Sequence, residues 1–146
     1  MCHTFASATL VLSLTVLLTA AHAADPRQLV KMPAPMQEHM LANMRDHLVA
    51  MGEIHAALGK GDFDRAADVA EQRIGMSSLQ AHDASHMAPY MPKGMQETGT
   101  AMHHAASRFA NTTQEAAVTN DLPRALGALA ELTQQCAACH AGYRLR

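Results

Sequence analysis

Apolar residues recur every three or four positions along most of the chain from residue 35 onward. This spacing is the period of an α-helix that buries one face. Glycine, proline and aspartate divide the pattern into four stretches, which predict helices over about residues 35–58, 63–82, 94–118 and 122–143. Ala, Leu, Met, Glu and Gln dominate, and β-branched clusters are absent. The sequence therefore predicts an all-α fold, an antiparallel up-down-up-down four-helix bundle.

The same period assigns an inner face to each of the first three predicted helices. The first buries Met40, Met44, His47, Leu48, Met51, Ile54, His55 and Leu58. The second buries Ala66, Ala67, Ala70, Ile74, Ser77, Ser78 and Ala81. The third buries Met95, Met102, Ala106, Phe109, Thr113 and Ala116. Gly59-Lys60-Gly61 is expected to end the first helix, and Asp62 is a good N-cap for the second.

The fourth predicted helix carries the clearest repeat. Its inner positions step by four and three residues, through Leu122, Leu126, Leu129, Thr133, Cys136, His140 and Tyr143. Asp121 is expected to cap this helix, and Pro123 is tolerated in its first turn. The repeat predicts that Cys136 and His140 both lie on the buried seam.

Near the end of the chain, Cys136-Ala137-Ala138-Cys139-His140 spells C-x-x-C-H, the attachment signature of c-type haem. Two thiols three residues apart on one helical turn can each add to a vinyl group at the haem edge. The histidine that follows is then placed beneath the iron as an axial ligand. One haem c per chain is the cofactor that this motif predicts.

Two other interpretations of the cysteine pair remain open, a redox dithiol or disulfide and half of a zinc site. A thioredoxin-like dithiol follows a strand at the start of a helix, and nothing in this sequence is typical of a βαβ unit. A structural zinc site usually needs a second ligand pair, and the mature chain has no other cysteine. Both alternatives are therefore disfavoured relative to haem.

Residues 1–23 are expected to be a secretory signal peptide. An apolar run over residues 8–21 leads into Ala21-His22-Ala23, which fits the small-x-small cleavage rule, although no lysine or arginine precedes the run. The run is too short and too near the cleavage site for a stable membrane span. Cys2 should leave with the signal, so that one domain spans residues 24–146. Haem c attachment normally follows export, which makes the periplasm the expected location.

Composition adds two constraints. The formal net charge is −2, which gives no argument for binding nucleic acid or an anionic membrane. Aromatic residues make up 3% of the sequence and tryptophan is absent. A large flat cofactor would supply core volume that these side chains do not. Nothing in the sequence resembles a hydrolytic triad or a paired-carboxylate site, so an enzyme is not expected.

A C-terminal haem motif in an exported four-helix chain resembles the class II cytochromes c, the cytochrome c prime family. Cys136-Ala-Ala-Cys139-His140-Ala-Gly-Tyr143-Arg144 is similar to the C-terminal signature of that family, including its aromatic-arginine pair. The spacing from Asp121 to Cys136 also matches. Weaker matches in the first helix and the following loop are Met44, Met51, Gly52, Lys60-Gly61 and Phe63-Asp64. The similarity covers nearly all of residues 24–146 and is weakest in the middle.

The resemblance implies a role for individual residues. Cys136 and Cys139 would form thioethers to the haem, and His140 would be the proximal iron ligand. Tyr143 and Arg144 belong to the cofactor-binding signature, with Arg144 beside the exposed side of that histidine. Met44 corresponds to the position over the distal side of the iron, where family members have either an apolar blocking residue or a ligating methionine.

The identity of the sixth ligand decides the expected function. Ligation by Met44 and His140 gives six-coordinate, low-spin iron suited to electron transfer to a redox partner protein in the periplasm. Met40 and His47 lie on the same stripe and are the reserve ligands. Without any of them the iron would be five-coordinate and suited to small gases such as nitric oxide.

The family often has Arg-Gln one turn before the distal position, where the pair contacts a haem propionate, whereas this chain has Met40-Leu41. The resemblance also makes a homodimer possible.

The segment between the second and third predicted helices allows a further alternative. Pro89 and Pro92 predict irregular structure over residues 82–93. The wider segment 82–104 gathers His82, His86, Met87, Met91, Met95, Met102, His103 and His104. Thioethers and imidazoles suit cuprous copper, so periplasmic copper binding is a second alternative function. The competing interpretation is that these flexible methionines pack over the haem edge.

Overall fold

The computed structural model describes residues 24–146, so the predicted signal peptide and Cys2 lie outside the described residues. The described chain is mostly helical, which confirms the all-α prediction. Its helices are α1 (Ala34–Leu58), α2 (Phe63–Arg73), α3 (Ala84–Met87), α4 (Lys93–Ala117) and α5 (Leu122–Gly142). Its strands are β1 (Gln28–Leu29) and β2 (Tyr143–Arg144).

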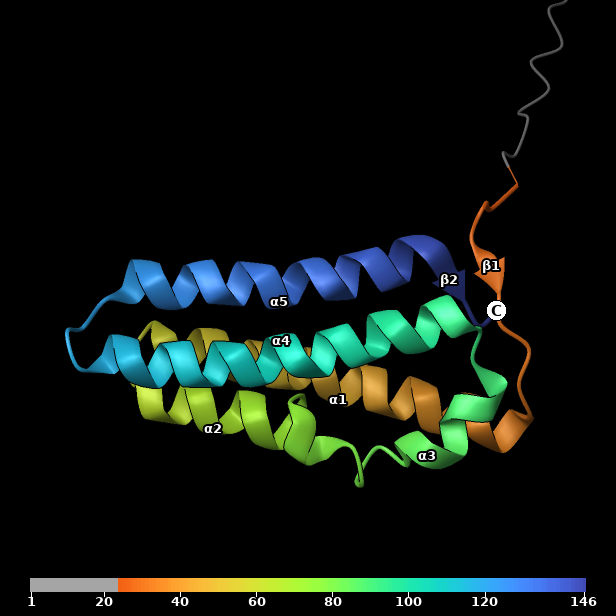
Figure 1. Ribbon diagram of the computed structural model, residues 1–146, viewed down its shortest axis with the longest axis horizontal. Coiled ribbons are helices and arrows are strands. Elements are labelled where there is room, and N and C mark those ends of the chain that lie inside the picture. The colour runs from red at the N-terminus through yellow and green to blue at the C-terminus, as the bar shows by residue number, and fades with distance from the viewer. Residues whose placement is uncertain (1–23) are drawn as a thin grey trace, which may run out of the picture.

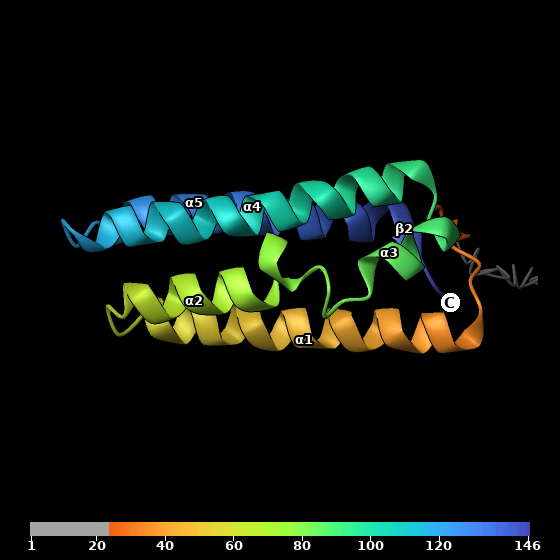
Figure 2. The same cartoon turned by 60° about the horizontal axis from the view of Figure 1, so that its bottom comes forward.

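Four of the helices, α1, α2, α4 and α5, run along one common direction (Figures 1 and 2). Helix α2 packs against both α1 and α4, and α4 packs against α5. The main core lies among these helices, and its largest fully buried apolar side chains are Phe109, Ile54, Ile74 and Leu132. Helix α3 and both strands lie at one end, and the α1–α2 and α4–α5 connections lie at the other (Figure 1).

The α1–α2 and α4–α5 connections end in the helix caps that the sequence predicts. The carboxylates of Asp62 and Asp121 accept hydrogen bonds from the backbone N–H groups of Arg65 and Arg124, at 3.1 and 3.0 Å. Each bond satisfies a donor that would otherwise be unpaired in the first turn of α2 or α5. Gly61 adopts a φ of 73°, in the left-handed region that glycine enters without steric cost.

The predicted extent of the second helix is wrong. Helix α2 ends at Arg73, nine residues before His82, and the chain continues through a 3-10 turn at Met76–Ser78. Gly75 takes an extended conformation with ψ of −174°, which the sequence pattern did not reveal. Beyond it, the N–H of Met76 donates to Ser107 Oγ on α4 at 3.0 Å. A tertiary hydrogen bond thus replaces the helical one, and the chain turns toward α4.

The predicted irregular segment contains some regular structure. Residues 84–87 form the single turn of α3, and a 3-10 turn follows at Ala88–Tyr90. Pro92 then stands just before α4, where a missing N–H costs nothing.

The chain termini form a contact that the sequence did not predict. Strands β1 and β2 pair in parallel, with Gln28 opposite Tyr143 and Leu29 opposite Arg144. The N–H of Val30 donates to the carbonyl of Arg144 at 2.8 Å, and Val30 itself is buried. The segment ahead of α1 is therefore fixed beside the residues that follow C-x-x-C-H.

The inner face of α5 differs from the predicted seam by one residue in places. Ala125, Leu129 and Leu132 are buried, and Cys136 and Cys139 continue the same face. Leu126 is 45% exposed, and Thr133 and His140 are exposed. Both series step by four and three residues, so periodicity alone did not separate them. The prediction that His140 lies on the buried seam is wrong.

The inner faces of the other helices were predicted more accurately, although Ser77 and Ala81, named for the second helix, lie beyond the end of α2 and are exposed. All six positions named for the third helix are buried. On α1, Met40, His47, Ile54 and Leu58 are buried as expected. Leu48 is 73% exposed and His55 is exposed, so these two assignments are wrong. Small residues, Ala50 and Ala57, take their places in the core because they allow α2 to approach closely.

None of the helices in residues 24–146 combines the length and the apolar character that crossing a membrane requires.

Candidate functional site

Cys136 and Cys139 lie on the last turns of α5 as free thiols, each half-buried. The side chain of Cys136 packs against the main core, whereas that of Cys139 packs against a second group of apolar side chains. Burial raises the pKa of both thiols. The pair is therefore protonated at neutral pH and held three residues apart on one helical face, the arrangement that C-x-x-C predicts.

The apolar group around Cys139 consists mainly of methionines. We call it the methionine cluster, with Val30, Met40, Met87 and Met95 buried and Met32, Met36, Met44, Met91, Cys139, Tyr143 and Leu145 half-buried around them. It contains seven of the 11 methionines in the sequence. Methionine is the most adaptable apolar side chain. This end of the molecule can therefore adjust its shape around a bound group more easily than the alanine-rich main core can.

Met44 and Met40 reach this cluster from α1. Met40 is 8% exposed and belongs to its buried part, whereas Met44 is half-buried at its edge. Met44 and Cys139 thus pack against the same group of side chains, although 94 positions separate them in the sequence. The structure brings together the predicted distal methionine and one of the two predicted attachment thiols.

His140, Tyr143 and Arg144 surround the end of α5. The His140 side chain is exposed, next to Cys139 in the last turn. The backbone N–H of Tyr143 donates to the carbonyl of Cys139 and ends the helix. Its ring lies over the start of α4, where a Cβ added to Gly94 would stand 2.6 Å from the Tyr143 hydroxyl. A larger residue at position 94 would therefore require the Tyr143 side chain to shift.

Arg144 has a buried Nε atom with no hydrogen-bond partner among the described residues. A carboxylate oxygen of Asp25 lies 3.6 Å from it, beyond hydrogen-bonding distance. The Nε therefore forms an ion pair with Asp25 but no hydrogen bond, and it could also donate to an anionic group such as a haem carboxylate.

The donor set at this end of the molecule fits a covalently attached haem. Two free thiols have the required spacing, an imidazole follows the second thiol, and thioethers pack beside it. The Nε atom of Arg144, ion-paired with Asp25 but without a hydrogen bond, adds a donor for a carboxylate. Cys136, Cys139 and His140 would hold the group, and Met44 would face it from α1.

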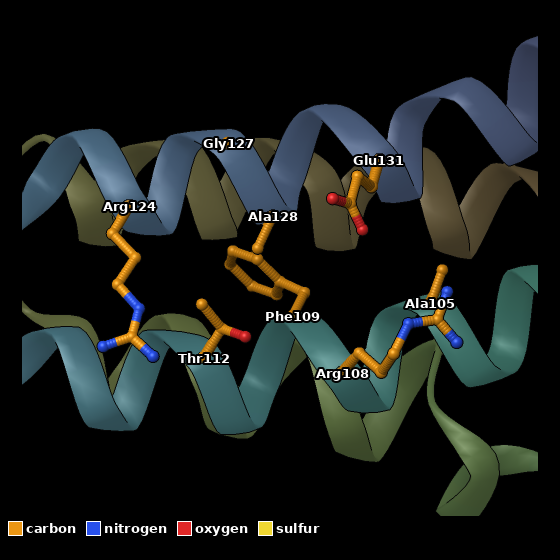
Figure 3. A pocket seen from close by; sticks show the side chains of 8 residues that line it. All are labelled: Ala105, Arg108, Phe109, Thr112, Arg124, Gly127, Ala128 and Glu131. Atoms are coloured by element: carbon orange, nitrogen blue, oxygen red, sulfur yellow. The ribbon is translucent and has the colours of Figure 1, made fainter.

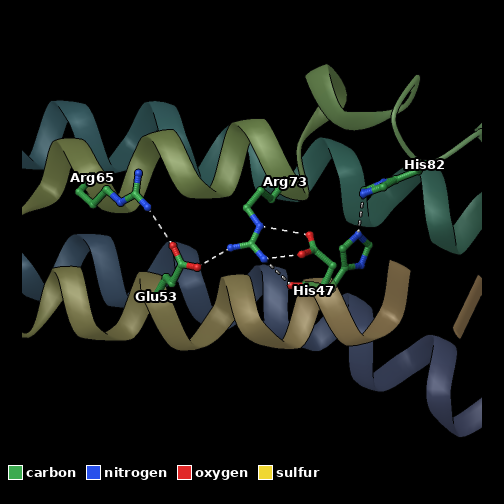
Figure 4. Close-up of polar contacts among 6 residues, drawn as sticks. His47, Glu53, Arg65, Arg73 and His82 are labelled. Atoms are coloured by element: carbon green, nitrogen blue, oxygen red, sulfur yellow. Dashed lines mark hydrogen bonds and ion pairs between the residues drawn. The ribbon is translucent and has the colours of Figure 1, made fainter. Parts of the chain in front are cut away.

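Three histidines that are distant in sequence meet between α1, α4 and the segment after α2. The Nε2 atoms of His47 and His82 are 3.3 Å apart (Figure 4). The ring centroid of His103 lies 5.6 Å from that of His82 and 6.3 Å from that of His47. We call these three residues the histidine trio. Sequence reasoning considered His47 as a reserve iron ligand and the other two as copper ligands, and did not group them.

The charged form is disfavoured throughout the histidine trio. Burial lowers the pKa of His47 to about 4, with His82 and His103 adding to the effect. Burial also lowers the pKa of His82 and of His103. All three rings are therefore neutral at pH 7, the form in which imidazole binds metals. In the arrangement described for residues 24–146, no three His, Cys, Asp or Glu side chains already converge to hold a metal ion.

The side chains of the Met- and His-rich segment 82–104 lie in separate parts of the structure. Met87, Met91 and Met95 pack in the methionine cluster, which supports the packing interpretation for these residues. His86 and His104 are exposed. The two remaining histidines of the segment belong to the histidine trio.

Two charged features lie away from the cysteines. Arg73 binds Asp46 and Glu53, and Glu53 also binds Arg65, so that these ion pairs join α1 to α2 (Figure 4). A surface hollow of about 310 Å³ opens between α4 and α5, where Arg108, Arg124 and Glu131 stand around Phe109 (Figure 3). None of the predicted site residues lines this hollow.

Comparisons with known protein families, curated proteins and solved structures find no match to this chain.

Proposed function

We propose that this chain is an exported c-type cytochrome that carries electrons in the periplasm by means of one covalently attached haem c. The observation that carries the proposal is the pair of free, half-buried thiols on α5, with Cys139 packed against the same cluster as Met44. We extend the all-α fold to the up-down-up-down four-helix bundle of the class II cytochromes c, with α1, α2, α4 and α5 as its helices.

The residues act in the following way. Cys136 and Cys139 would hold the haem, each thiol adding across one vinyl group with its sulfur on one carbon and its proton on the other. When bound, the haem supplies an iron that alternates between the ferric and ferrous states. His140, exposed in the last turn of α5, and Met44 would be the side chains that ligate the iron, and the Nε of Arg144 would be available to a propionate. The methionine cluster keeps water away, which favours the less charged ferrous state.

With both His140 and Met44 as ligands, the iron would have no position left for a substrate, so we propose a carrier and not an enzyme. A periplasmic redox partner protein exchanges the electron. The exposed Leu48 and Val49 on α1, at 73% and 56% exposure, support the homodimer that the family resemblance makes possible.

Visible spectroscopy tests the carrier function. The full chain is produced in a host that exports it and attaches haem c, and its spectrum is recorded oxidised, reduced, and reduced with carbon monoxide. We expect a sharp reduced α-band, reversible one-electron reduction and no shift with carbon monoxide. A broad high-spin Soret band that shifts with carbon monoxide would instead establish the five-coordinate, gas-binding alternative.

A further inference from the structure

The histidine trio has the geometry of a second metal site, independent of the haem. In tetrahedral coordination with metal–nitrogen bonds of 2.0–2.1 Å, two ligand nitrogens stand about 3.3 Å apart. The Nε2 atoms of His47 and His82 are 3.3 Å apart. Two ligands of such a site are therefore already at the separation that a tetrahedral ion requires.

Hydrogen bonds to the other ring nitrogens fix the tautomers. Ser78 Oγ donates to the carbonyl of Gly75 at 2.7 Å, so its proton is used. The Nδ1 of His82, 3.2 Å from that oxygen, must then be the donor, which leaves a lone pair on Nε2. His103 likewise donates from Nδ1 to the carbonyl of Ile74 at 2.5 Å. A partner on the other ring nitrogen, such as Ser78 for His82, characteristically orients a metal-binding histidine.

The third ligand requires one adjustment. His103 stands within reach of the pair, with ring centroids 5.6 and 6.3 Å away, but the three side chains do not yet converge. A swing of the His103 ring toward the pair, which gives up the hydrogen bond from its Nδ1 to the carbonyl of Ile74, completes the set. His47, which donates from Nε2 to His82 when no metal is present, must move its proton to Nδ1, so binding releases no net proton.

We propose that His47, His82 and His103 bind one d¹⁰ ion, Zn²⁺ or Cu⁺, and so tie α1, the segment after α2 and α4 together. Both ions favour imidazole and tolerate tetrahedral or three-coordinate geometry. The site differs from copper binding by segment 82–104, because its central ligand comes from α1 and the methionines take no part. A bound ion cross-links three segments that are distant in sequence, and it therefore stabilises the folded chain.

Calorimetric titration of the haem-loaded, EDTA-treated chain tests the site. ZnSO₄ is used in one arm, and Cu⁺ supplied anaerobically by a competing chelator in the other, with native mass spectrometry to count bound ions. We expect one ion per chain, with a Kd of about 1 µM or lower in at least one arm, and a rise in Tm. The affinities measured in the two titrations show which ion the site binds. Absence of stoichiometric binding in both arms would overturn the proposal.

The variants His47→Gln, His82→Gln and His103→Gln should each weaken binding by more than about tenfold. The matched control is His104→Gln, which changes an exposed histidine beside His103 and should bind like the parent. Equal binding by all four variants, or loss in the control alone, would contradict the proposal. Anomalous scattering at the zinc edge from crystals of the unmutated chain gives a second answer that needs no variant. A peak among the three rings supports the site, and a peak only elsewhere overturns it.

This test stands apart from the haem proposal. If the cysteines carry no haem, their thiols would compete for the metal, so the titration is then run on the Cys136→Ser/Cys139→Ser variant. Failure of haem attachment and failure of the metal site are thus separate results.

Discussion

At the scale of single residues, the proposed carrier function depends on the sulfur of Met44. Met44→Leu keeps the apolar volume but removes the thioether, since leucine and methionine exchange with little packing cost. In the haem-loaded protein we expect a change from low spin to high spin, binding of carbon monoxide, and a reduction potential lower by on the order of 100 mV. Optical spectra with a redox titration measure all three.

Met51→Leu is the matched control for this prediction. Met51 is a half-buried methionine on the same helix, but it packs against the main core. Its variant should keep the parent spectrum. A low-spin, carbon-monoxide-insensitive Met44→Leu protein would remove Met44 as the ligand and turn attention to Met40.

His47 makes the stability of the metal-free chain depend on pH. Its pKa is about 4 when folded and about 6.5 when unfolded, so between these values the unfolded chain binds more protons. The stability that neutral His47 contributes is fully present above pH 6.5 and is lost as the pH falls toward 4, by on the order of 3 kcal/mol. The groups facing it are His82, His103, Asp46 and Arg73.

Urea unfolding in EDTA, at pH values about one unit apart between 7.5 and 4, measures the slope of the free energy of unfolding against pH. His47→Gln should flatten it, and His55→Gln, which changes an exposed histidine on the same helix, should leave it unchanged. Part of the slope should persist in His47→Gln, because burial also lowers the pKa of His82 and His103. Equal slopes in the parent and His47→Gln would contradict this assignment.

At the scale of the helices, replacing Gly127 and Gly94 by alanine should change the stability of the fold in opposite directions. Gly127→Ala in the middle of α5 meets no atom within 4 Å, so it should stabilise the fold by up to about 1 kcal/mol. Gly94→Ala brings a Cβ to 2.6 Å from the Tyr143 hydroxyl, so it should destabilise by about 1 kcal/mol or more. Thermal unfolding of the two variants measures the difference, and equal effects would show that Tyr143 moves aside freely.

The helices also mark how far the sequence could be interpreted. Their existence and most ends were predictable, because Asp62 and Asp121 form local caps that depend only on neighbouring residues. The end of α2 was not, because it depends on a bond from Met76 to Ser107 in another helix. The seam of α5 was displaced because Ala125 and Leu126 both fit a four-three repeat, and only packing against α4 selects the alanine.

The candidate site also has features that the local sequence predicts and features that depend on distant residues. C-x-x-C-H is a local motif and could be interpreted without a structure, and the position of Met44 followed from the family resemblance. The histidine trio and the pairing of β1 with β2 could not be predicted. Each joins residues separated by 20 to more than 100 positions, and nothing in the local pattern around His82 or Gln28 points to its partner.

At the scale of the whole molecule, the main core and the methionine cluster differ in packing. The main core is closed by alanines around Phe109, a well-defined and closely packed arrangement. The other end is closed by flexible methionines around Cys139, in a chain with 3% aromatic residues. A rigid, flat group attached there would replace contacts among adaptable side chains with a single fixed surface, which is the role that we propose for haem.

The mass of the intact secreted chain tests this account most directly. The full sequence is exported from cells that contain the haem attachment machinery, purified, denatured and weighed. We predict a coloured protein whose mass equals residues 24–146 plus one haem, retained under denaturing conditions and lost when Cys136 and Cys139 are both changed to serine. A colourless protein with only the mass of its amino acids would contradict the central claim.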